Sequence, residues 1–252
     1  MEPSIGLELA ALLFACAIGI GCLDAISGGG GLLTVPLLLA LGFPPTQALA
    51  TNKLQGAFGT GSSTLTFARA GTIDGPAMWP AALCALVGAA LGTLVVQQID
   101  VGVLRRLIPL VLIAVALYFL LSPRLGDADQ RQRLPMAFFA PLVAGGIAFY
   151  DGLLGLGTGA FLVASTAGLL GQNLRTATAH AKLLNFTSNV GSLTFFVLGG
   201  NVVWAAGFAM AAGQVIGARL GARAVLVKGA KLVRPLVVVA ALGMAVRLLL
   251  VG

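Results

Sequence analysis

Residues 24–54 read DAISGGGGLLTVPLLLALGFPPTQALATNKL, and this stretch decides the fold. An aspartate and four consecutive glycines precede a short apolar segment, 32–42, which ends at the turn GFPPT. The helical pattern that follows carries Lys53 among residues that are otherwise apolar or uncharged. A lysine deep in an apolar helix is costly unless it has a partner or a function, so the solvent around these helices must be established first.

The composition indicates an integral membrane protein. Of the 252 residues, 58% are hydrophobic and 9% are charged, and the mean hydropathy is +1.01. Soluble domains carry about 25% charged residues, so this chain could not cover its surface with polar groups in water. Apolar runs approach the roughly 20 residues that cross a bilayer as a helix, and they are continuous rather than alternating, which favours helices over a barrel. The runs lie at 5–23, 77–96, 107–121, 136–149 and 232–246.

The same features argue against several other classes. The first run is flanked by Glu2 and Glu8 instead of the basic residues of a signal peptide, so a mature span is predicted. The net charge of +7 does not indicate nucleic acid as a partner, because no soluble domain is left to bind it. No cofactor or metal motif is found. Cys16, Cys22 and Cys84 form no C-x-x-C pair, which favours packing roles, although a thiol relay stays open.

The deciding stretch occurs twice. At a shift of 129 residues, A-T-N-K-L at 50–54 aligns with A-H-A-K-L at 179–183. Upstream, Asp24 aligns with Asp151 at a shift of 127, and each is followed by a glycine cluster, SGGGG at 27–31 and GLGTG at 155–159. We therefore predict two repeats in a single membrane domain, 1–121 and 136–252, joined by a polar linker, 122–135.

Each repeat is predicted to hold four spans, which makes the fold an all-α membrane protein of about eight transmembrane helices. The short segments 32–42 and 160–170 cannot cross a bilayer alone, so each is expected to be a glycine-broken or re-entrant half-helix. A first span precedes each break, and the later spans are expected at 46–68, 77–98, 103–121, 176–198, 203–226 and 232–250.

Loop charges predict how the repeats are oriented. Arg105 and Arg106 lie between the last two spans of the first half. The corresponding region of the second half holds Arg219, Arg223, Lys228, Lys231 and Arg234. If both regions are cytoplasmic, an even number of spans separates them, which predicts parallel repeats with the linker and both termini outside. An inverted repeat would follow if the short segment also crossed, and transporters use both plans.

The repeated motifs form a candidate anion site. Glycine lets the backbone turn sharply, and a following helix N-terminus presents unpaired N–H groups, although close helix packing also explains many glycines. Lys53 and Lys182 are predicted to converge as fixed positive charges, the alternative being that each reaches the lipid headgroups. Ser188 and Asn189 are further polar neighbours. The candidate substrate-binding residues are Gly28, Gly29, Gly30, Gly31, Thr51, Asn52, Lys53, Gln55, Gly157, Thr158, Gly159, His180, Lys182 and Asn185.

Asp24 and Asp151 are the only acids within the predicted spans. Each is expected either to pair with the lysine of its own half or to take up a proton that couples transport. His180 replaces Thr51 of the first repeat, which leaves a proton-linked or substrate contact open beside a satisfied core histidine. Coupling to sodium is left open as well.

The stretch 24–54 resembles the opening signature of the TauE/SafE family of membrane transporters, the sulfite exporter group. The weaker second copy, DGLLGLGTGAFLVASTAGLLGQNLRTATAHAKLLN at 151–185, fits the second half of that family. The resemblance covers nearly the whole chain. It implies a multi-pass protein of a prokaryotic cytoplasmic membrane that exports, or in some members imports, small sulfur-containing anions such as sulfite, thiosulfate or sulfonates. Thr158 interrupts the second glycine cluster, so the two half-sites need not be equivalent.

The sequence supports a hydrolase less well than a transporter, and it leaves a channel or an importer open. An intramembrane hydrolase would use the serines of GTGSS at 59–63 with His180 as base, but the G-x-S-G order is absent and a repeated chain suits transport better. A channel differs from a transporter only in whether both sides open together. That alternative, an importer, and another small anion as substrate remain open at this point.

Overall fold

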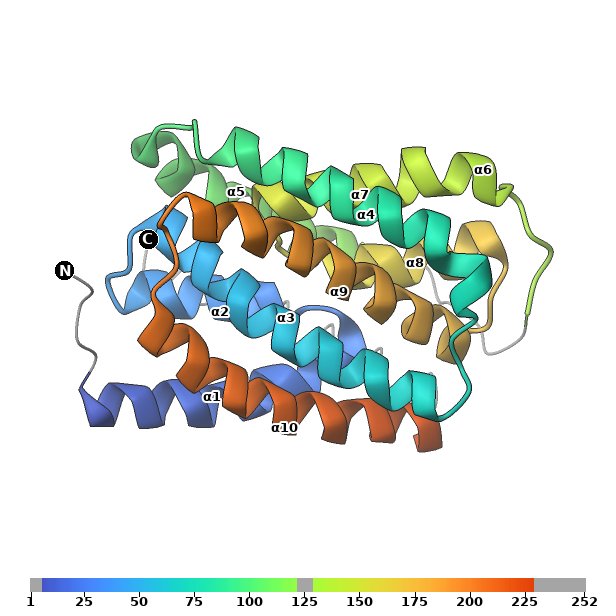
Figure 1. Ribbon diagram of the computed structural model, residues 1–252, viewed down its shortest axis with the longest axis horizontal. Helices are drawn as coiled ribbons and strands as arrows, with labels where there is room; N and C mark the ends of the chain where they lie inside the picture. Colours follow the sequence, from blue (N-terminus) through green and yellow to red (C-terminus); the bar gives the residue numbers. More distant parts are fainter. Residues whose placement is uncertain (1–5, 122–128, 229–252) are drawn as a thin grey trace.

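The computed structural model describes residues 6–121 and 129–228, and nearly all of these residues are helical (Figure 1). The first half contains α1 (Leu7–Ser27), α2 (Gly30–Ala40), α3 (Pro45–Arg69), α4 (Gly75–Val96) and α5 (Val101–Leu121). The second half contains α6 (Met136–Phe138), a π-helical turn (Phe139–Ala144), α7 (Gly145–Leu153), α8 (Thr158–Leu170), α9 (Leu174–Leu198) and α10 (Trp204–Lys228). The all-α prediction is confirmed for the described residues, and the predicted span 232–250 lies outside them.

Local sequence explains where the long helices begin. The first residue of α3 is Pro45, at a position where the missing N–H costs no hydrogen bond. The side chains of Asp74 and Asn173 precede α4 and α9, and each accepts a backbone N–H of the first turn at 3.0 Å. These capping residues place the helix starts within a few residues of the predicted positions.

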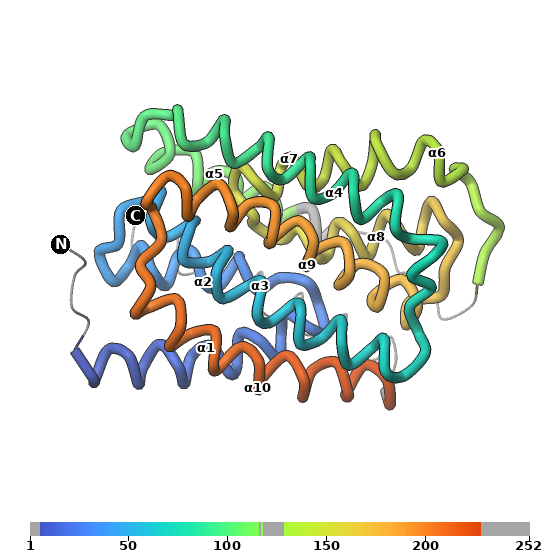
Figure 2. Tube along the Cα trace, in the orientation of Figure 1, coloured from blue at the N-terminus to red at the C-terminus, as the bar shows by residue number. Residues whose placement is uncertain are grey.

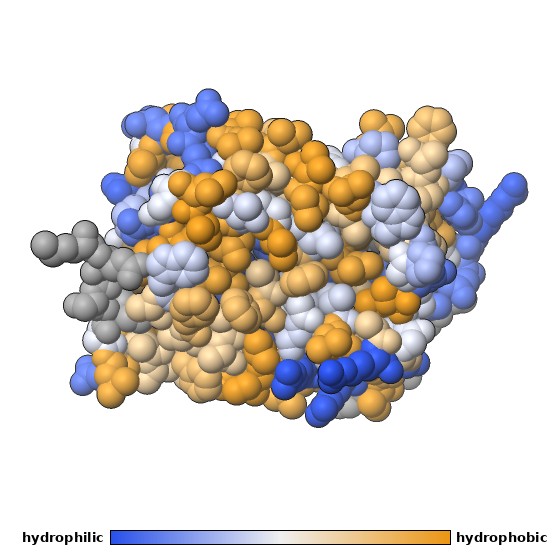
Figure 3. All heavy atoms as spheres, in the orientation of Figure 1, coloured by the Kyte–Doolittle hydropathy of each residue, from blue (hydrophilic) through white to orange (hydrophobic). Residues whose placement is uncertain are grey.

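Polar residues lie inside the bundle and apolar residues lie outside, as expected for a protein surrounded by lipid. On the face shown in Figure 3, hydrophobic residues cover the middle of the surface and hydrophilic residues gather at its edges. Large apolar side chains such as Leu83, Leu110 and Leu142 are more than half exposed. By contrast, α3 and α9 bury a row of hydroxyl, amide and lysine side chains. The interior is therefore the hydrophilic region of the molecule.

Four described segments are long and apolar enough to cross a membrane: Leu7–Ser27, Gly75–Val96, Met136–Leu153 and Trp204–Val227. The helices α3 and α9 have 25 residues each, which at about 1.5 Å per residue also reaches across a bilayer. Their buried polar residues make them less apolar than the other spans. The total of eight spans stays a prediction.

Each short helix folds back beside the helix that precedes it, so each half begins with a hairpin (Figure 2). In the first hairpin, Leu41 at the end of α2 packs in the same cluster as Leu9 and Leu13 near the start of α1. In the second, the carbonyl of Leu169 near the end of α8 accepts the N–H of Arg133, just before α6, at 2.9 Å. The glycine breaks at the tips are buried within the protein.

Equivalent helices of the two halves run in opposite directions. The N–H of Val203, just before α10, donates to Thr51 Oγ1 near the start of α3 at 3.3 Å. The N–H of Asp74, just after α3, donates to His180 Nε2 near the start of α9 at 3.0 Å. Hence α3 ends where α9 begins. We call the end with turns 41–44, 97–100 and 199–203 end A, and the end with 70–74, 129–135 and 171–173 end B (Figure 1).

The parallel arrangement predicted from loop charges is therefore wrong, and the repeat is inverted. The prediction failed because the short segment was assumed to leave the chain on the side that the first helix had reached. In the structure, α2 returns the chain to end A, where α1 began. A helix of 11 residues can do so because the break lies inside the protein, not at its surface. Consequently Arg105 lies near end A, whereas Arg219 and Arg223 lie in the part of α10 near end B.

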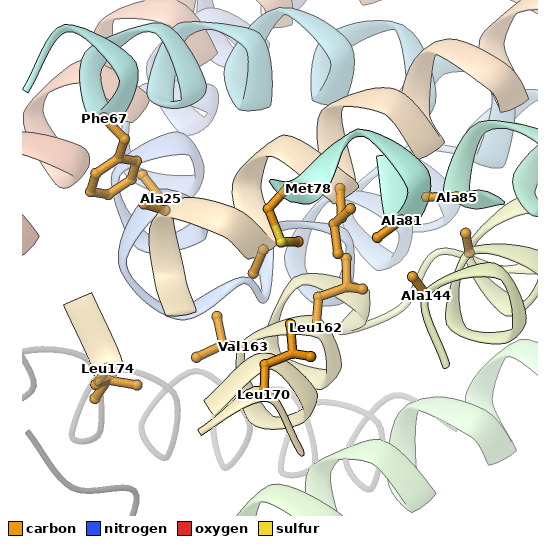
Figure 4. Packing of buried hydrophobic residues seen from close by; sticks show 14 of the residues in the cluster. Ala25, Phe67, Met78, Ala81, Ala85, Ala144, Leu162, Val163, Leu170 and Leu174 are labelled. Atoms are coloured by element: carbon orange, nitrogen blue, oxygen red, sulfur yellow. The ribbon is translucent and has the colours of Figure 1, made fainter. Parts of the chain in front are cut away.

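The apolar core lies mainly between α4, α7, α8 and α9, with alanines where the helices approach most closely (Figure 4). Glycines bring some backbones into direct contact. A Cβ at Gly88 of α4 would overlap the carbonyl of Gly145 on α7, and one at Gly217 of α10 would overlap the carbonyl of Ile18 on α1. Each of these two close pairs, α4–α7 and α1–α10, combines one helix from each half.

Cysteine labelling distinguishes the inverted arrangement from the parallel one. In a variant without the native cysteines, Gln98→Cys and Leu198→Cys should label from one side of the membrane. Arg131→Cys and Arg175→Cys should label from the other side, because they lie at end B. Parallel repeats would separate the members of each pair, so labelling of Gln98→Cys and Leu198→Cys from opposite sides would contradict the structure.

The same labelling also reports which end is cytoplasmic. End B carries Arg69, Arg131, Arg133, Arg175, Arg219 and Arg223, against Arg105 and Arg106 at end A. The positive-inside rule therefore predicts that end B, including residues 129–135 of the linker, is cytoplasmic. This orientation reverses the one that the loop charges predicted for the linker.

Candidate functional site

The two glycine breaks meet at the centre of the bundle. Gly28 ends α1 in a left-handed conformation, with φ of 75°, which glycine adopts without strain. A Cβ at Gly28 would overlap the backbone of Gly159 and Ala160, and a Cβ at Gly159 would overlap Gly28 in return. Backbone therefore packs directly on backbone at the tips of the two hairpins, which requires glycine at both positions.

Two ion pairs are buried beside this crossing among the described residues, and both connect the two halves. Lys53 Nζ of α3 lies 2.7 Å from Asp151 Oδ2 of α7, and Lys182 Nζ of α9 lies 2.9 Å from Asp24 Oδ2 of α1. The lysine side chains are 1% and 0% exposed. The expectation that each aspartate pairs with the lysine of its own half is corrected: in an inverted repeat, each lysine helix passes the break of the other half.

Further hydrogen bonds hold the carboxylates in place. Asp24 Oδ1 accepts the N–H of Gly30 at 2.8 Å, and Lys182 also donates to the main-chain carbonyl of Asp24. Asp151 Oδ2 accepts the hydroxyl of Ser188. Lys53 Nζ contacts Asp151, and it has no other acceptor among the described residues, whereas an ammonium group has three N–H donors. Lys53 therefore retains N–H donors that a ligand can use.

A cavity of about 20 Å³ lies at the crossing, which is room for roughly one water molecule. An oxyanion of four heavy atoms does not fit into this space in this conformation. Both aspartates line the cavity, and the two lysines lie behind them. The lining residues are Asp24, Gly28, Gly30, Gly31, Asn52, Gln55, Gly56, Thr60, Asp151, Gly155, Thr158, Gly159, Asn185, Asn189 and Gln214.

The half-helices α2 and α8 begin at this cavity and lead away from it towards opposite ends. A helix N-terminus carries positive partial charge and unpaired N–H groups. The backbone N–H groups of Thr158 and Gly159 make no hydrogen bond to the described residues, and both residues line the cavity. Two positive helix ends, two lysines and two carboxylates thus converge at one point inside the membrane protein.

Most predicted site residues come together here, but Thr51 and His180 do not line the cavity and instead bind residues towards opposite ends of the molecule. Thr51 Oγ1 accepts the N–H of Val203 at end A, and His180 Nε2 accepts the N–H of Asp74 at end B. His180 Nδ1 lies 2.9 Å from Gln172 Oε1, which assigns the ring proton to Nδ1. The two residues are equivalent in the repeat, and each ties its lysine helix to the start of a helix from the other half.

Several cavity residues were not predicted, and the repeat could have indicated some of them. Gly56 and Thr60 align with Asn185 and Asn189 at the shift of 129, and Asn189 Nδ2 donates to Thr60 Oγ1 at 3.4 Å. Gln214 gave no such signal. Gly29 and Gly157 flank the lining residues, and the free cysteines Cys16, Cys22 and Cys84 are half-buried without lining the cavity.

Comparison with known proteins gives one consistent result. The profile of the sulfite exporter TauE/SafE family matches residues 13–248. The chain is 46% identical over 235 residues to a probable membrane transporter protein of Haemophilus influenzae, covering 93% of this chain and 92% of that protein. It is 46% identical over 241 residues to the probable membrane transporter protein YfcA of Escherichia coli K12, covering 96% and 90%. No solved structure matches the chain.

Apolar outer helices, broken helices and a polar centre, together with these relatives, define the class as a multi-pass membrane transporter. Within that class, the chain belongs to the TauE/SafE family, whose profile spans most of its length. The resemblance of residues 24–54 and 151–185 to this family is confirmed. The names of these relatives state neither a substrate nor a direction of transport.

Substitution of neighbouring glycines tests the crossing of the hairpins. Gly28→Ala should destabilise the protein by at least about 1–2 kcal/mol, because it strains a left-handed backbone and overlaps Gly159. Gly29→Ala is the matched control, since a Cβ there makes only ordinary contacts at 3.5 Å. Thermal unfolding in detergent measures both, and equal stability of the two variants would contradict the backbone contact.

Double variants test the pairing across halves. Lys53→Met alone leaves the buried carboxylate of Asp151 without a counter-charge and should cost about 3–5 kcal/mol of folding stability. Adding Asp151→Asn removes the stranded charge and should recover much of this loss, whereas adding Asp24→Asn should increase it. Recovery by Asp24→Asn instead would indicate pairing within one half.

Proposed function

We propose that the protein moves a small sulfur-containing oxyanion of the sulfite, thiosulfate or sulfonate class across the inner membrane of a prokaryote, as an exporter. The observation that carries the proposal is the pair of buried lysines, each held by an aspartate of the other half, at the convergence of two helix N-termini. Such a site offers charge-assisted hydrogen bonds to an anion that has lost its water. The family description supports the sulfur-containing class.

The anion takes the place of the aspartates as the counter-ion of the lysines. Both carboxylates stand between the lysines and the cavity, so an anion that enters without other change meets negative charge. Protonation of Asp24 or Asp151 removes that repulsion and frees the adjacent lysine. A bare carboxylate left without its lysine would be strongly destabilised, so substrate binding is linked to proton uptake. Sodium is the alternative coupling ion.

The small volume of the cavity favours alternating access over a channel. A space for about one water molecule cannot conduct an oxyanion, so one of the hairpins must move before substrate enters. Inverted repeats supply two related ways of opening the site, one towards each end of the molecule. Because α2 leads from the cavity towards end A and α8 leads from it towards end B, the hairpins α1–α2 and α7–α8 are the parts that would open the site.

A hydrolase receives no support from the serines of residues 59–63. Ser62 donates to the carbonyl of Val215, and Ser63 donates to carbonyls within α3. Both ring nitrogens of His180 are engaged by Gln172 and the N–H of Asp74. Among the described residues, no serine hydroxyl is hydrogen-bonded to His180, so the pair lacks the geometry of a nucleophile and its base.

Transport in proteoliposomes tests the proposal. Flux of sulfite, thiosulfate, a sulfonate and a small carboxylate should be compared under imposed pH and sodium gradients. Lys53→Met and Lys182→Met should each weaken anion affinity by roughly 10- to 100-fold, because each variant loses a charge-assisted hydrogen bond to the anion. Asp24→Asn or Asp151→Asn should remove the response to the pH gradient.

Arg175→Met is the control, since it removes an exposed positive charge at end B. Wild-type affinity in both lysine variants would rule out the two-lysine site. Flux that follows only a sodium gradient would replace the proton with sodium as the coupling ion.

A further inference from the structure

Gln214 of α10 lies at the central cavity, although no motif and no repeat predicts it. Its side chain is 2% exposed and belongs to the lining of the cavity. The equivalent position of the first half is Ala85, which packs in the apolar core between α4 and α7 (Figure 4). The amide therefore has no counterpart, and it makes the site asymmetric.

The neighbouring helices leave room for this side chain. A Cβ at Gly21 of α1 would lie 2.5 Å from Gln214 Oε1, and one at Gly59 of α3 would lie 2.7 Å from the same atom. Both separations are shorter than real contacts of a Cβ atom. Glycine is therefore needed on both helices for the amide to lie between α1 and α3.

No hydrogen bond joins the amide of Gln214 to a described residue, and its nitrogen and oxygen are not among the fully buried unpaired atoms, so the amide borders the cavity. A buried amide without a partner costs free energy that an apolar side chain of the same shape would avoid. Two polar atoms of residues that line this cavity are fully buried and unpaired, Gln55 Oε1 and Thr158 Oγ1. Polar groups left unpaired around one cavity indicate a ligand that satisfies them.

We propose that Gln214 is a specificity-determining residue of the substrate site, and that its amide donates a hydrogen bond to an oxygen of the bound anion. The inference rests on the proposed transport of a sulfur-containing oxyanion. A pyramidal SO₃ group presents three oxygens as acceptors, whereas a carboxylate presents two. A lysine, the Thr158 hydroxyl and the Gln214 amide, on different helices, provide a donor for each oxygen of an SO₃ group. Since the amide is neutral, it adds a donor without changing the charge balance of the ion pairs.

The test compares Gln214→Met with wild type in anion binding and in stability. Methionine keeps the length and volume of glutamine but removes the donor. Sulfite affinity should fall by about tenfold and formate affinity by less than about twofold, measured by calorimetry on purified protein. The melting temperature without ligand should stay equal or rise, because an unpaired polar group has been removed. Gln98→Met, an exposed position at end A, is the control and should change neither affinity.

A purely structural role predicts that Gln214→Met binds sulfite as wild type does, and that result would overturn the inference. If the methionine variant does not fold, Gln214→Glu, which keeps the shape but replaces the donor with a carboxylate, should also lose at least about tenfold in sulfite affinity. Wild-type affinity in that variant would overturn the inference equally. If wild-type protein itself binds no sulfur-containing oxyanion, the proposed function fails, and the role of Gln214 fails with it.

Discussion

A lysine inside a membrane-spanning bundle needs a counter-charge, and both lysines find it in the other half of the chain. Removing an ammonium and a carboxylate from water costs several kcal/mol for each ion, so neither partner can be left alone. The pairs Lys53–Asp151 and Lys182–Asp24 therefore attach each lysine helix to the opposite glycine break. This attachment brings the tips of both hairpins, and the N-termini of α2 and α8, to one point. The cavity, its small volume and its polar lining all follow from that constraint.

The parts of the fold that depend on local sequence could be predicted. Glycine runs, prolines and capping side chains act within a few residues, so the breaks and the bounds of α3 and α9 were close to the structure. The direction of the repeats depends on the depth at which the break lies in the bundle, which neither composition nor loop charge reports. The relative direction of the two repeats decides which lysine each aspartate meets. The incorrect prediction of parallel repeats therefore also paired each aspartate with the wrong lysine.

In the candidate site, too, residues close to a motif in the sequence could be predicted, whereas a residue that only helix packing brings there could not. Asn52, Gln55 and Asn185 lie on the same helices as the lysines, and their polar side chains within three residues of a lysine were sufficient to indicate them. Thr51 and His180 share that proximity in sequence, but each lies two residues before its lysine, nearer to the start of the helix, and they bind the starts of α10 and α4. Gln214 comes from a helix without a motif, and only the packing of α10 on α1 and α3 brings it to the cavity.

The close helix pairs α1–α10 and α4–α7 have a consequence for how the protein is made. Because α1 emerges from the ribosome first and α10 much later, α1 must reside in the bilayer without its neighbour for most of synthesis. A solitary helix in lipid has to be apolar around its whole circumference. The mean hydropathy of the candidate spans falls in the order of their synthesis, from α1 through α4 and the α6–α7 segment to α10. Helix α1 is thus suited to residing in lipid without a partner, whereas the less apolar α10 enters a membrane in which α1 already lies.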